Sequence, residues 1–229
     1  VQPTTEPTAE PSVQPTTEPT TKPSKKPGVK DQSKLSPSEV VKLKLPVFLA
    51  MGKDGNHKVK ISWAKYAGAT GYDCYWSYCN GKKKFEKFAK ITNGKRSVMQ
   101  KNLKNNQCYK YYIVAYKLVD GKKVYIAKSN QLHVAMKKNN RTNAVSISVN
   151  KNKLSIKSGQ TFTIKAKTKL ENSKKKQLIH AKVYRYYSSD KKVAVVSKSG
   201  KITAKSKGKC TIAVVANNGV CKKITVKVK

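Results

Sequence analysis

The chain has 229 residues, and its 50 lysine and arginine side chains against 11 aspartate and glutamate side chains give a formal net charge of +39. That length suits one large domain or two of ordinary size, and a hydrophobic content of 38% is low for a single compact globule. No segment approaches the roughly 20 apolar residues of a membrane helix, so we expect no membrane span. No basic and apolar leader stands at Val1, and we expect the numbering to start after a removed signal or inside a longer protein.

The first 30 residues form a repetitive tract in which proline recurs at every fourth position from Pro3 to Pro27. Each proline fixes its own backbone and pushes the preceding residue to extended geometry. The tract has almost nothing apolar to bury, so it cannot offset the entropy of ordering. We therefore predict a disordered Pro/Thr/Glu-rich linker over residues 1–44, acting as a semi-rigid spacer. A proline-rich docking ligand is the less favoured alternative, because the Thr/Glu filler is so regular.

From residue 45 the pattern changes to short strands in which apolar and polar residues alternate. Val59, Ile61 and Trp63 alternate with lysine and serine, and turn signals recur every eight to twelve residues. This spacing, without a 3.6-residue period, predicts an antiparallel β-sandwich over residues 45–137. A short linker at 138–143 then leads to a second all-β unit at 144–229. The predicted fold class is all-β, with two tandem antiparallel β-sandwiches.

Several motifs of the first sandwich stand in a characteristic order: Ile61-Ser62-Trp63, Gly68-Ala69-Thr70-Gly71-Tyr72, Leu103 with Tyr109 six residues on, Asp120-Gly121-Lys122-Lys123 and Ser129-Asn130. In these motifs the first sandwich resembles a fibronectin type III domain of the bacterial kind. The resemblance implies that Trp63 is a core residue. It also implies that Tyr109 is the tyrosine-corner residue, whose hydroxyl bonds to nearby backbone.

The second sandwich has its own set of motifs: Ser188-Ser189-Asp190, Val193-Ala194-Val195-Val196, Ser199 to Ala204, Gly208 with Thr211-Ile212, and the closing alternation from Ile224 to Val228. In these motifs it is similar to group 2 bacterial immunoglobulin-like domains, so the predicted fold class is all-β with two tandem immunoglobulin-like or fibronectin-III-like sandwiches. The resemblance implies a structural core position for Tyr186, where the family usually has tryptophan. Both families typically occur as spacers and adhesion modules of bacterial proteins, often attached to enzymes, which implies an extracellular or cell-surface location.

The charge of the two sandwiches comes almost entirely from lysine. After residue 44 there are 43 basic against 6 acidic side chains, and only three of the basic residues in the whole chain are arginine. Specific recognition of bases or phosphates favours the planar fork of arginine, whereas scattered lysine gives a diffuse positive coat. The favoured interpretation is that the lysines are simply the solvated face of each sheet. A useful attraction to anionic wall polymers or glycans comes second, and no specific nucleic-acid partner is expected.

Three tyrosines are candidates for glycan contact. The alternation places Tyr75, Tyr112 and Tyr116 on the outward face of two neighbouring strands, where they could form an exposed aromatic patch. The competing interpretation, which we favour, is cross-strand aromatic pairing that stabilises the sheet.

The chain has five cysteines, an odd number, with no CxxC spacing. Cys79 ends one predicted strand and Cys108 begins its neighbour, so we predict a disulfide between them, consistent with an oxidising compartment. Cys74 and Cys210 fall at core positions, and a bond between Cys210 and Cys221 is left open.

No constellation for catalysis, cofactor binding or metal binding emerges from the sequence. The three histidines lie far apart, and isolated carboxylates fall short of the ligand number that calcium requires. We therefore expect a monomeric, non-catalytic spacer or adhesion region, without a cofactor, of a larger secreted or surface protein. Its expected partners are anionic cell-wall polymers or glycans and an upstream module of the same polypeptide. The alternative is a specific carbohydrate-binding appendage of a glycan-degrading enzyme.

Overall fold

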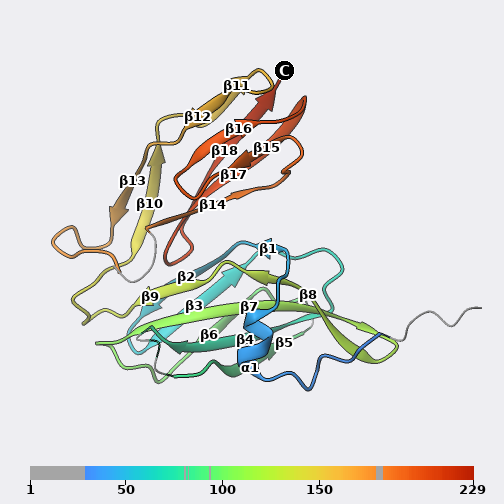
Figure 1. The fold of residues 1–229 in the computed structure, drawn as a ribbon. Coiled ribbons are helices and arrows are strands. Elements are labelled where there is room, and N and C mark those ends of the chain that lie inside the picture. Colours follow the sequence, from blue (N-terminus) through green and yellow to red (C-terminus); the bar gives the residue numbers. More distant parts are fainter. Residues whose placement is uncertain (1–28, 80, 82, 93, 179–182) are drawn as a thin grey trace, which may run out of the picture.

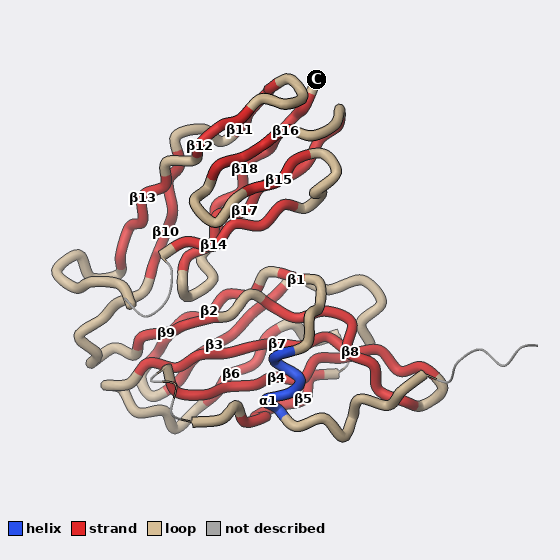
Figure 2. Tube along the Cα trace, viewed as in Figure 1, coloured by secondary structure: helices blue, strands red, loops and turns tan. Residues whose placement is uncertain are grey.

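The computed structural model describes residues 29–79, 81, 83–92, 94–178 and 183–229. The chain is nearly all β and forms two sandwiches, one above the other in Figures 1 and 2. The predicted fold class is therefore confirmed. Most of the predicted linker, residues 1–28, lies outside the described residues.

The first module consists of two facing sheets. The larger sheet has the order β1-β8-β7-β4-β5, and β9 pairs with the other half of β7. The smaller sheet has the order β2-β3-β6. The strands are β1 (Val47–Phe48), β2 (Ala50–Gly55), β3 (Lys58–Trp63), β4 (Gly71–Tyr78), β5 (Glu86–Ile91), β6 (Ser97–Gln100), β7 (Cys108–Val119), β8 (Lys122–Ser129) and β9 (Leu132–Ala135).

Alternation along each strand fills the core between these sheets. On β3, Val59 and Ile61 are fully buried, while Lys58 and Lys60 are exposed. Side chains on a strand point to opposite faces in turn, so one hydrophobic half faces the opposing sheet. β4 departs from this pattern, because both of its faces are buried from Gly71 to Tyr75.

Helix α1 (Pro37–Lys42) explains the burial of the outer face of β4. Ser36 caps the helix: its hydroxyl oxygen accepts the Glu39 amide, while the Glu39 carboxylate accepts the Ser36 amide at 2.8 Å. Such a reciprocal capping box stabilises the first turn of a helix. Val40 and Val41 are buried against the larger sheet, across which α1 lies in Figure 1. The predicted linker of residues 1–44 therefore ends in a folded segment that belongs to the first module.

The second module has three sheets around its own core. The orders are β11-β18-β17-β14, β12-β16-β15 and β10-β13. The strands are β10 (Ala144–Val149), β11 (Lys153–Ile156), β12 (Thr161–Thr163), β13 (Ala166–Leu170), β14 (Tyr184–Ser188), β15 (Ala194–Val196), β16 (Lys201–Ala204), β17 (Gly208–Ala216) and β18 (Cys221–Val228). The core contains Ile202, Ile212, Val214, Ile224 and Val226, all fully buried.

The turn between β17 and β18 joins the two modules. The Gly52 amide donates to the Asn218 carbonyl at 2.8 Å, and the His133 amide donates to the Asn217 carbonyl at the same distance. Gly219, with φ +90°, sits so close to the Ala50 carbonyl oxygen that a Cβ there would overlap it. A side chain has no room at this position, so the turn seats directly on β2 and next to β9.

Candidate functional site: a cationic surface and an intermodule groove

Lysines occupy the outward positions of the strands. On β18, Lys223 and Lys227 are exposed, whereas Ile224, Val226 and Val228 between and after them are buried. Within the described part of the chain, lysine–carboxylate ion pairs occur only at Asp73. The positive charge of the surface is therefore almost entirely uncompensated by neighbouring carboxylates, and its field reaches the solvent.

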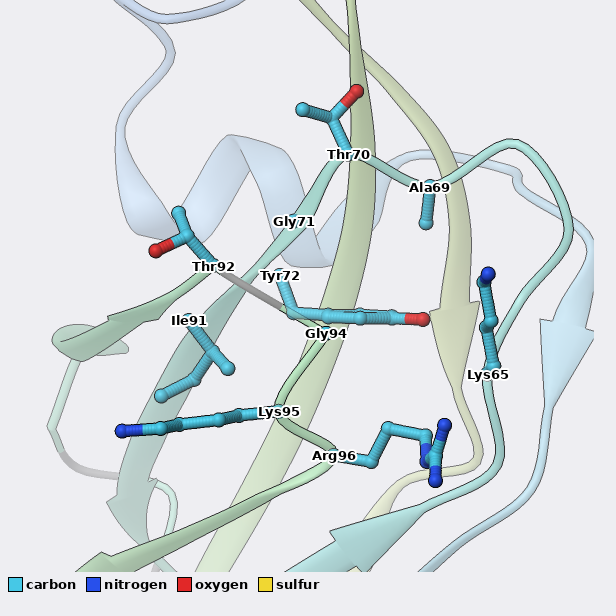
Figure 3. Close-up of a pocket in the computed structure, with 10 residues that line it drawn as sticks. All are labelled: Lys65, Ala69, Thr70, Gly71, Tyr72, Ile91, Thr92, Gly94, Lys95 and Arg96. Atoms are coloured by element: carbon cyan, nitrogen blue, oxygen red, sulfur yellow. The ribbon is translucent and has the colours of Figure 1, made fainter.

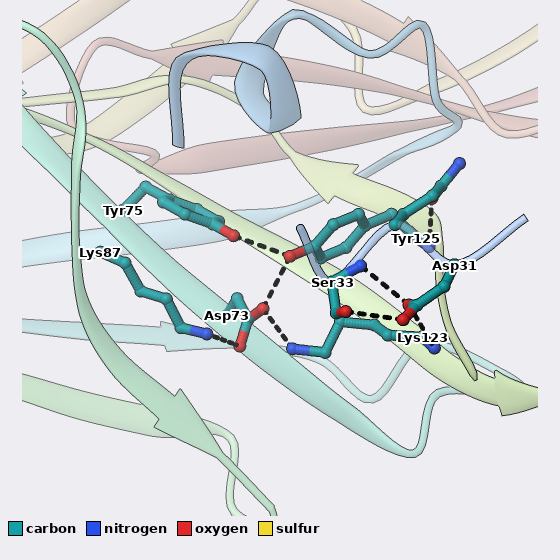
Figure 4. A network of polar contacts seen from close by, with 8 residues as sticks. Asp31, Ser33, Asp73, Tyr75, Lys87, Lys123 and Tyr125 are labelled. Atoms are coloured by element: carbon teal, nitrogen blue, oxygen red, sulfur yellow. Dashed lines mark hydrogen bonds and ion pairs between the residues drawn. The ribbon is translucent and has the colours of Figure 1, made fainter. Parts of the chain in front are cut away.

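Asp73 on β4 is the buried exception, and it organises the polar network of Figure 4. Its two carboxylate oxygens lie 2.9 Å from Lys87 Nζ and 2.7 Å from Lys123 Nζ, and one also accepts the Tyr125 hydroxyl at 2.8 Å. The Tyr75 hydroxyl lies 2.9 Å from the Tyr125 hydroxyl. Burial by itself would raise the pKa of Asp73, but the hydrogen bonds from Lys123, Lys87 and Tyr125 outweigh it and hold this pKa below its usual 3.8.

The same network fastens the segment before α1 to the edge of the first module. The Gln32 amide donates to the Lys123 carbonyl at 2.9 Å, and the Lys123 amide donates to Asp31 Oδ1 at 3.1 Å. The Tyr125 amide donates to Gln32 Oε1 at 2.8 Å. Asp31 and Gln32 are thus bonded along β8, from which the chain leads into α1.

This packing contradicts the less favoured of the two interpretations, an exposed patch of Tyr75, Tyr112 and Tyr116. Tyr75 and Tyr116 are each only 2% exposed, because Val40 and Val41 of α1 cover them. Tyr75 stands opposite Tyr112 in the β4–β7 register, which is the cross-strand pairing of the competing interpretation. Tyr112 remains half-buried.

The predicted disulfide partners are neighbours at the end of β4 and the start of β7. The Cys79 amide donates to the Cys108 carbonyl at 2.9 Å, and both thiols are free in the structure. Cys79 Sγ lies 3.3 Å from His133 Nδ1. Burial raises the pKa of Cys79 to about 12 and that of Cys108 to about 11, so neither is a reactive thiolate at neutral pH. The disulfide stays a prediction for the oxidised protein.

The three residues assigned to structural cores lie inside the sandwiches or at their edge. Trp63 is 7% exposed, and Tyr109 is 1% exposed with its hydroxyl accepting the Lys104 amide at 2.9 Å. Tyr186 is half-buried, and its ring packs over Gly200, whose φ of +86° and missing Cβ leave room for it. Cys74 and Cys210 are buried.

A small basic pocket lies at the end of the first module near Tyr72 (Figure 3). Its volume is about 90 Å³, and Lys65, Lys95 and Arg96 are among its lining residues. Figure 3 shows Lys65 and Arg96 toward the hydroxyl end of Tyr72, with Lys95 extending to the opposite side. The Tyr72 hydroxyl is already engaged, because it accepts the Tyr66 amide at 2.9 Å. Such a pocket has room for only a few atoms.

A larger groove lies between the modules, with a volume of about 880 Å³. We call it the intermodule groove; it is lined by residues 45–47, residues 186–189, Lys191, Val195 and Val196. The first range leads into β1, and the others come from β14, β15 and the turn that connects them. Its size falls within the range of small-molecule and sugar sites.

Charged and aromatic side chains gather beside this groove where the modules meet. Arg185 Nη1 donates to the Gln131 carbonyl at 2.9 Å, which ties β14 to the first module. Burial raises the pKa of Tyr112, and Arg185 opposes that rise while Tyr187 adds to it, so these residues of the two modules lie within electrostatic reach. Lys128 Nζ lies 5.5 Å from the centre of the Tyr112 ring, and burial lowers the pKa of Lys128.

Among the described residues there is no group of three or more histidine, cysteine or acidic side chains that could hold a metal ion. At the module boundary, Asp54 lies within electrostatic reach of Glu171. Burial raises the pKa of Asp54, and the nearby Glu171 raises it further. The Asn143 side-chain amide donates to Asp54 Oδ1 at 3.0 Å.

Comparison with known families identifies the second module. Residues 143–228 match the family model of the bacterial Ig-like domain (group 2), within one residue of the predicted limits at each end. A comparison with curated proteins found no match. In the part of the chain that the structure describes, no helix has the length and apolar character to cross a membrane.

Similar solved structures include both a bacterial enzyme and fibronectin type III domains. Pectate lyase PelI from Erwinia chrysanthemi, in complex with tetragalacturonic acid, is 12% identical over 38% of this chain and 27% of that chain, with a TM-score of 0.30. An FN3 domain of human collagen XX is 14% identical over 40% of this chain and 91% of that one, with a TM-score of 0.30. A myokine structure is 14% identical over 40% of this chain and 95% of that chain, with a TM-score of 0.32.

Proposed function

We propose that the chain is a spacer and adhesion region of a larger secreted or cell-surface bacterial protein, and that its surface attracts anionic polymers of the cell wall or of glycans. The match of residues 143–228 to bacterial Ig-like domains supports a surface module. The observation that carries the polymer attraction is charge: 43 basic against 6 acidic side chains follow residue 44, and the described ion pairs gather at Asp73 alone.

Lysine suits weak and multivalent adhesion. Its ammonium group is strongly hydrated and sits on a flexible stem, so each contact with an anion is loose, exchangeable and not selective in geometry. Many such contacts along one polymer add up, because binding at the first site raises the effective concentration at the next. The proline-rich tract supplies reach between these modules and an upstream module, in which any catalytic activity would reside.

The proposal predicts retention on a charged polymer but not on the same polymer without charge. The full chain is passed over immobilised dextran sulfate and over unsubstituted dextran, at low and at high ionic strength. We expect retention on dextran sulfate at low salt, release at high salt because the charges are screened, and no retention on dextran.

A charge-reduced variant controls for binding through a defined site. Exposed lysines remote from the groove, such as Lys157, Lys205 and Lys227, are changed to glutamine together. If binding is through a diffuse coat, the variant should elute from dextran sulfate earlier than the wild type, by an amount that depends on the charge removed and not on the position of the lysines. Equal retention on dextran and dextran sulfate, or retention that high salt leaves unchanged, would contradict the proposal.

A further inference from the structure

We propose that the intermodule groove is a binding site for one strand of an acidic polysaccharide, with Tyr187 and Lys191 as its main contacts. The inference rests on the proposed function and gives it a defined site: the lysine coat attracts the polymer, and the groove selects sugar chains that carry carboxylates. Neither module forms the groove alone, because residues 45–47 supply one wall and β14 and β15 supply the other.

The register of β14 decides which tyrosine faces outward. Tyr186 pairs with Val214 and packs onto the core of the second module over Gly200. Since neighbouring side chains on a strand point to opposite faces, Tyr187 and Arg185 point away from that core. Arg185 reaches the first module through its bond to the Gln131 carbonyl. Tyr187 is therefore directed to the space between the modules.

The lining chemistry fits a sugar ring. Tyr187 is only half-buried, and its hydroxyl makes no hydrogen bond to any described residue, so both its ring and its hydroxyl can meet a ligand. The face of an aromatic ring carries partial negative charge and attracts the weakly positive C–H groups of a pyranose. Val47, Val195 and Val196 add apolar surface, and Val47 is 43% exposed although it belongs to a strand.

The charges around the groove favour an acidic sugar over a neutral one. Lys191 is exposed and lines the groove, and Arg185 lies within electrostatic reach of Tyr187. No carboxylate is among the described lining residues. The nearest in sequence, Asp190, has Oδ1 turned back to accept the Lys192 amide at 2.8 Å. An incoming carboxylate therefore meets Lys191 in the groove itself, while the nearest acid in sequence lies outside the lining.

The test uses the full chain and a short uronic acid oligomer, with binding measured by isothermal titration calorimetry at moderate ionic strength. Tyr187→Ala removes the ring that a sugar would stack on, so we expect at least about fivefold weaker binding. Tyr187→Phe keeps the ring and should bind within about threefold of the wild type. Thermal unfolding of each variant shows whether the fold is retained.

Lysine variants separate the groove from the coat. Lys191→Ala and Lys157→Ala remove the same charge from exposed positions, but only Lys191 lines the groove. We expect about fivefold or greater loss for Lys191→Ala and less than about twofold loss for Lys157→Ala. Equal losses of affinity for the two lysine variants, together with an unchanged affinity in Tyr187→Ala, would show that the groove is not the binding site. The proposed function would still stand in that case, because it depends on salt-sensitive retention on dextran sulfate.

Two further ligands test the chemical class. The methyl-esterified oligomer keeps the sugar rings and lacks the charges, and we expect it to bind at least about tenfold more weakly. Esterified and free oligomers of equal affinity would refute the acidic specificity. Poly-glutamate carries carboxylates without sugar rings; if it bound as tightly as the oligomer and lost as much affinity in Tyr187→Ala, the groove would be a peptide site and the inference would be wrong.

Discussion

Asp73 is the residue whose replacement tests the packing of the first module most sharply. The change Asp73→Asn keeps the size and shape of the side chain but removes a negative charge that is fully buried and contacts Lys87 Nζ, Lys123 Nζ and the Tyr125 hydroxyl. What remains is an ammonium group on Lys123, whose side chain is only 13% exposed, without its counter-charge.

The expected loss in the free energy of unfolding depends on which of the two lysine side chains can become solvated. Breaking a fully buried ion pair by removing one partner typically costs about 3–5 kcal/mol. The Lys87 side chain is 37% exposed and can turn to solvent, and asparagine can still accept one hydrogen bond. We therefore expect a loss of about 2–3 kcal/mol, carried mainly by Lys123. For a module of this size that loss corresponds to a fall in Tm of roughly 8–24 °C.

The assay is urea unfolding followed by tryptophan fluorescence, since both tryptophans belong to the first module. Asp120→Asn is the matched control, because Asp120 is exposed in the β7–β8 turn and its φ of +50° suits asparagine equally well. We expect the control to stay within about 0.5 kcal/mol of the wild type.

The pH dependence supplies a second check. The folded-state pKa of Asp73 lies below its ordinary 3.8, so its contribution to stability is complete above that ordinary value and is lost as the pH falls through the folded-state pKa. The difference between wild type and Asp73→Asn should be constant from neutral pH to about 4 and shrink below it. A difference under about 0.5 kcal/mol at neutral pH, or one that grows in acid, would refute the reasoning.

Three other changes probe separate parts of the molecule. Ser36→Ala removes the capping box of α1 and should cost about 1 kcal/mol, seen as faster amide exchange in the sheet face under the helix; unchanged exchange there would count against the docked helix. Oxidation of Cys79 with Cys108 predicts three free thiols in the unreduced protein, and a count of five would rule the disulfide out. Gly219→Ala places a methyl group against the Ala50 carbonyl oxygen, so the modules should separate and unfold in two independent transitions; a single transition and unchanged small-angle scattering would contradict the docked turn.

Period-two alternation was enough to predict the two sandwiches, because the hydrophobic face of each strand has to be buried against another sheet. It also placed Tyr75 and Tyr112 on the same face of neighbouring strands. The less favoured alternative, an exposed patch, is contradicted because alternation shows that a face points out of the sandwich, but not whether another segment covers it. Here α1 covers Tyr75 and Tyr116. The six residues of α1 are too few to show a helical period.

A signal for α1 was present in Ser36-Pro37-Ser38-Glu39 followed by Val40-Val41, which is a capping box with proline at the first helical position. The intermodule groove had no comparable signal. Tyr187 and Val47 are distant in sequence, and they line one groove because the β17–β18 turn and Arg185 hold the two modules together. Contacts between modules depend on the shapes of both surfaces, which no local pattern encodes.

If the uncompensated lysine coat drives adhesion, the affinity for an anionic polymer depends steeply on salt, and this dependence can be measured directly. Binding of the full chain to soluble dextran sulfate is titrated from about 0.05 to about 0.2 M salt, and the logarithm of the association constant is plotted against the logarithm of the salt concentration. Displacement of counterions by several lysines predicts a straight line with a steep negative slope. A flat line with retained affinity would show that the lysine surface does not drive binding.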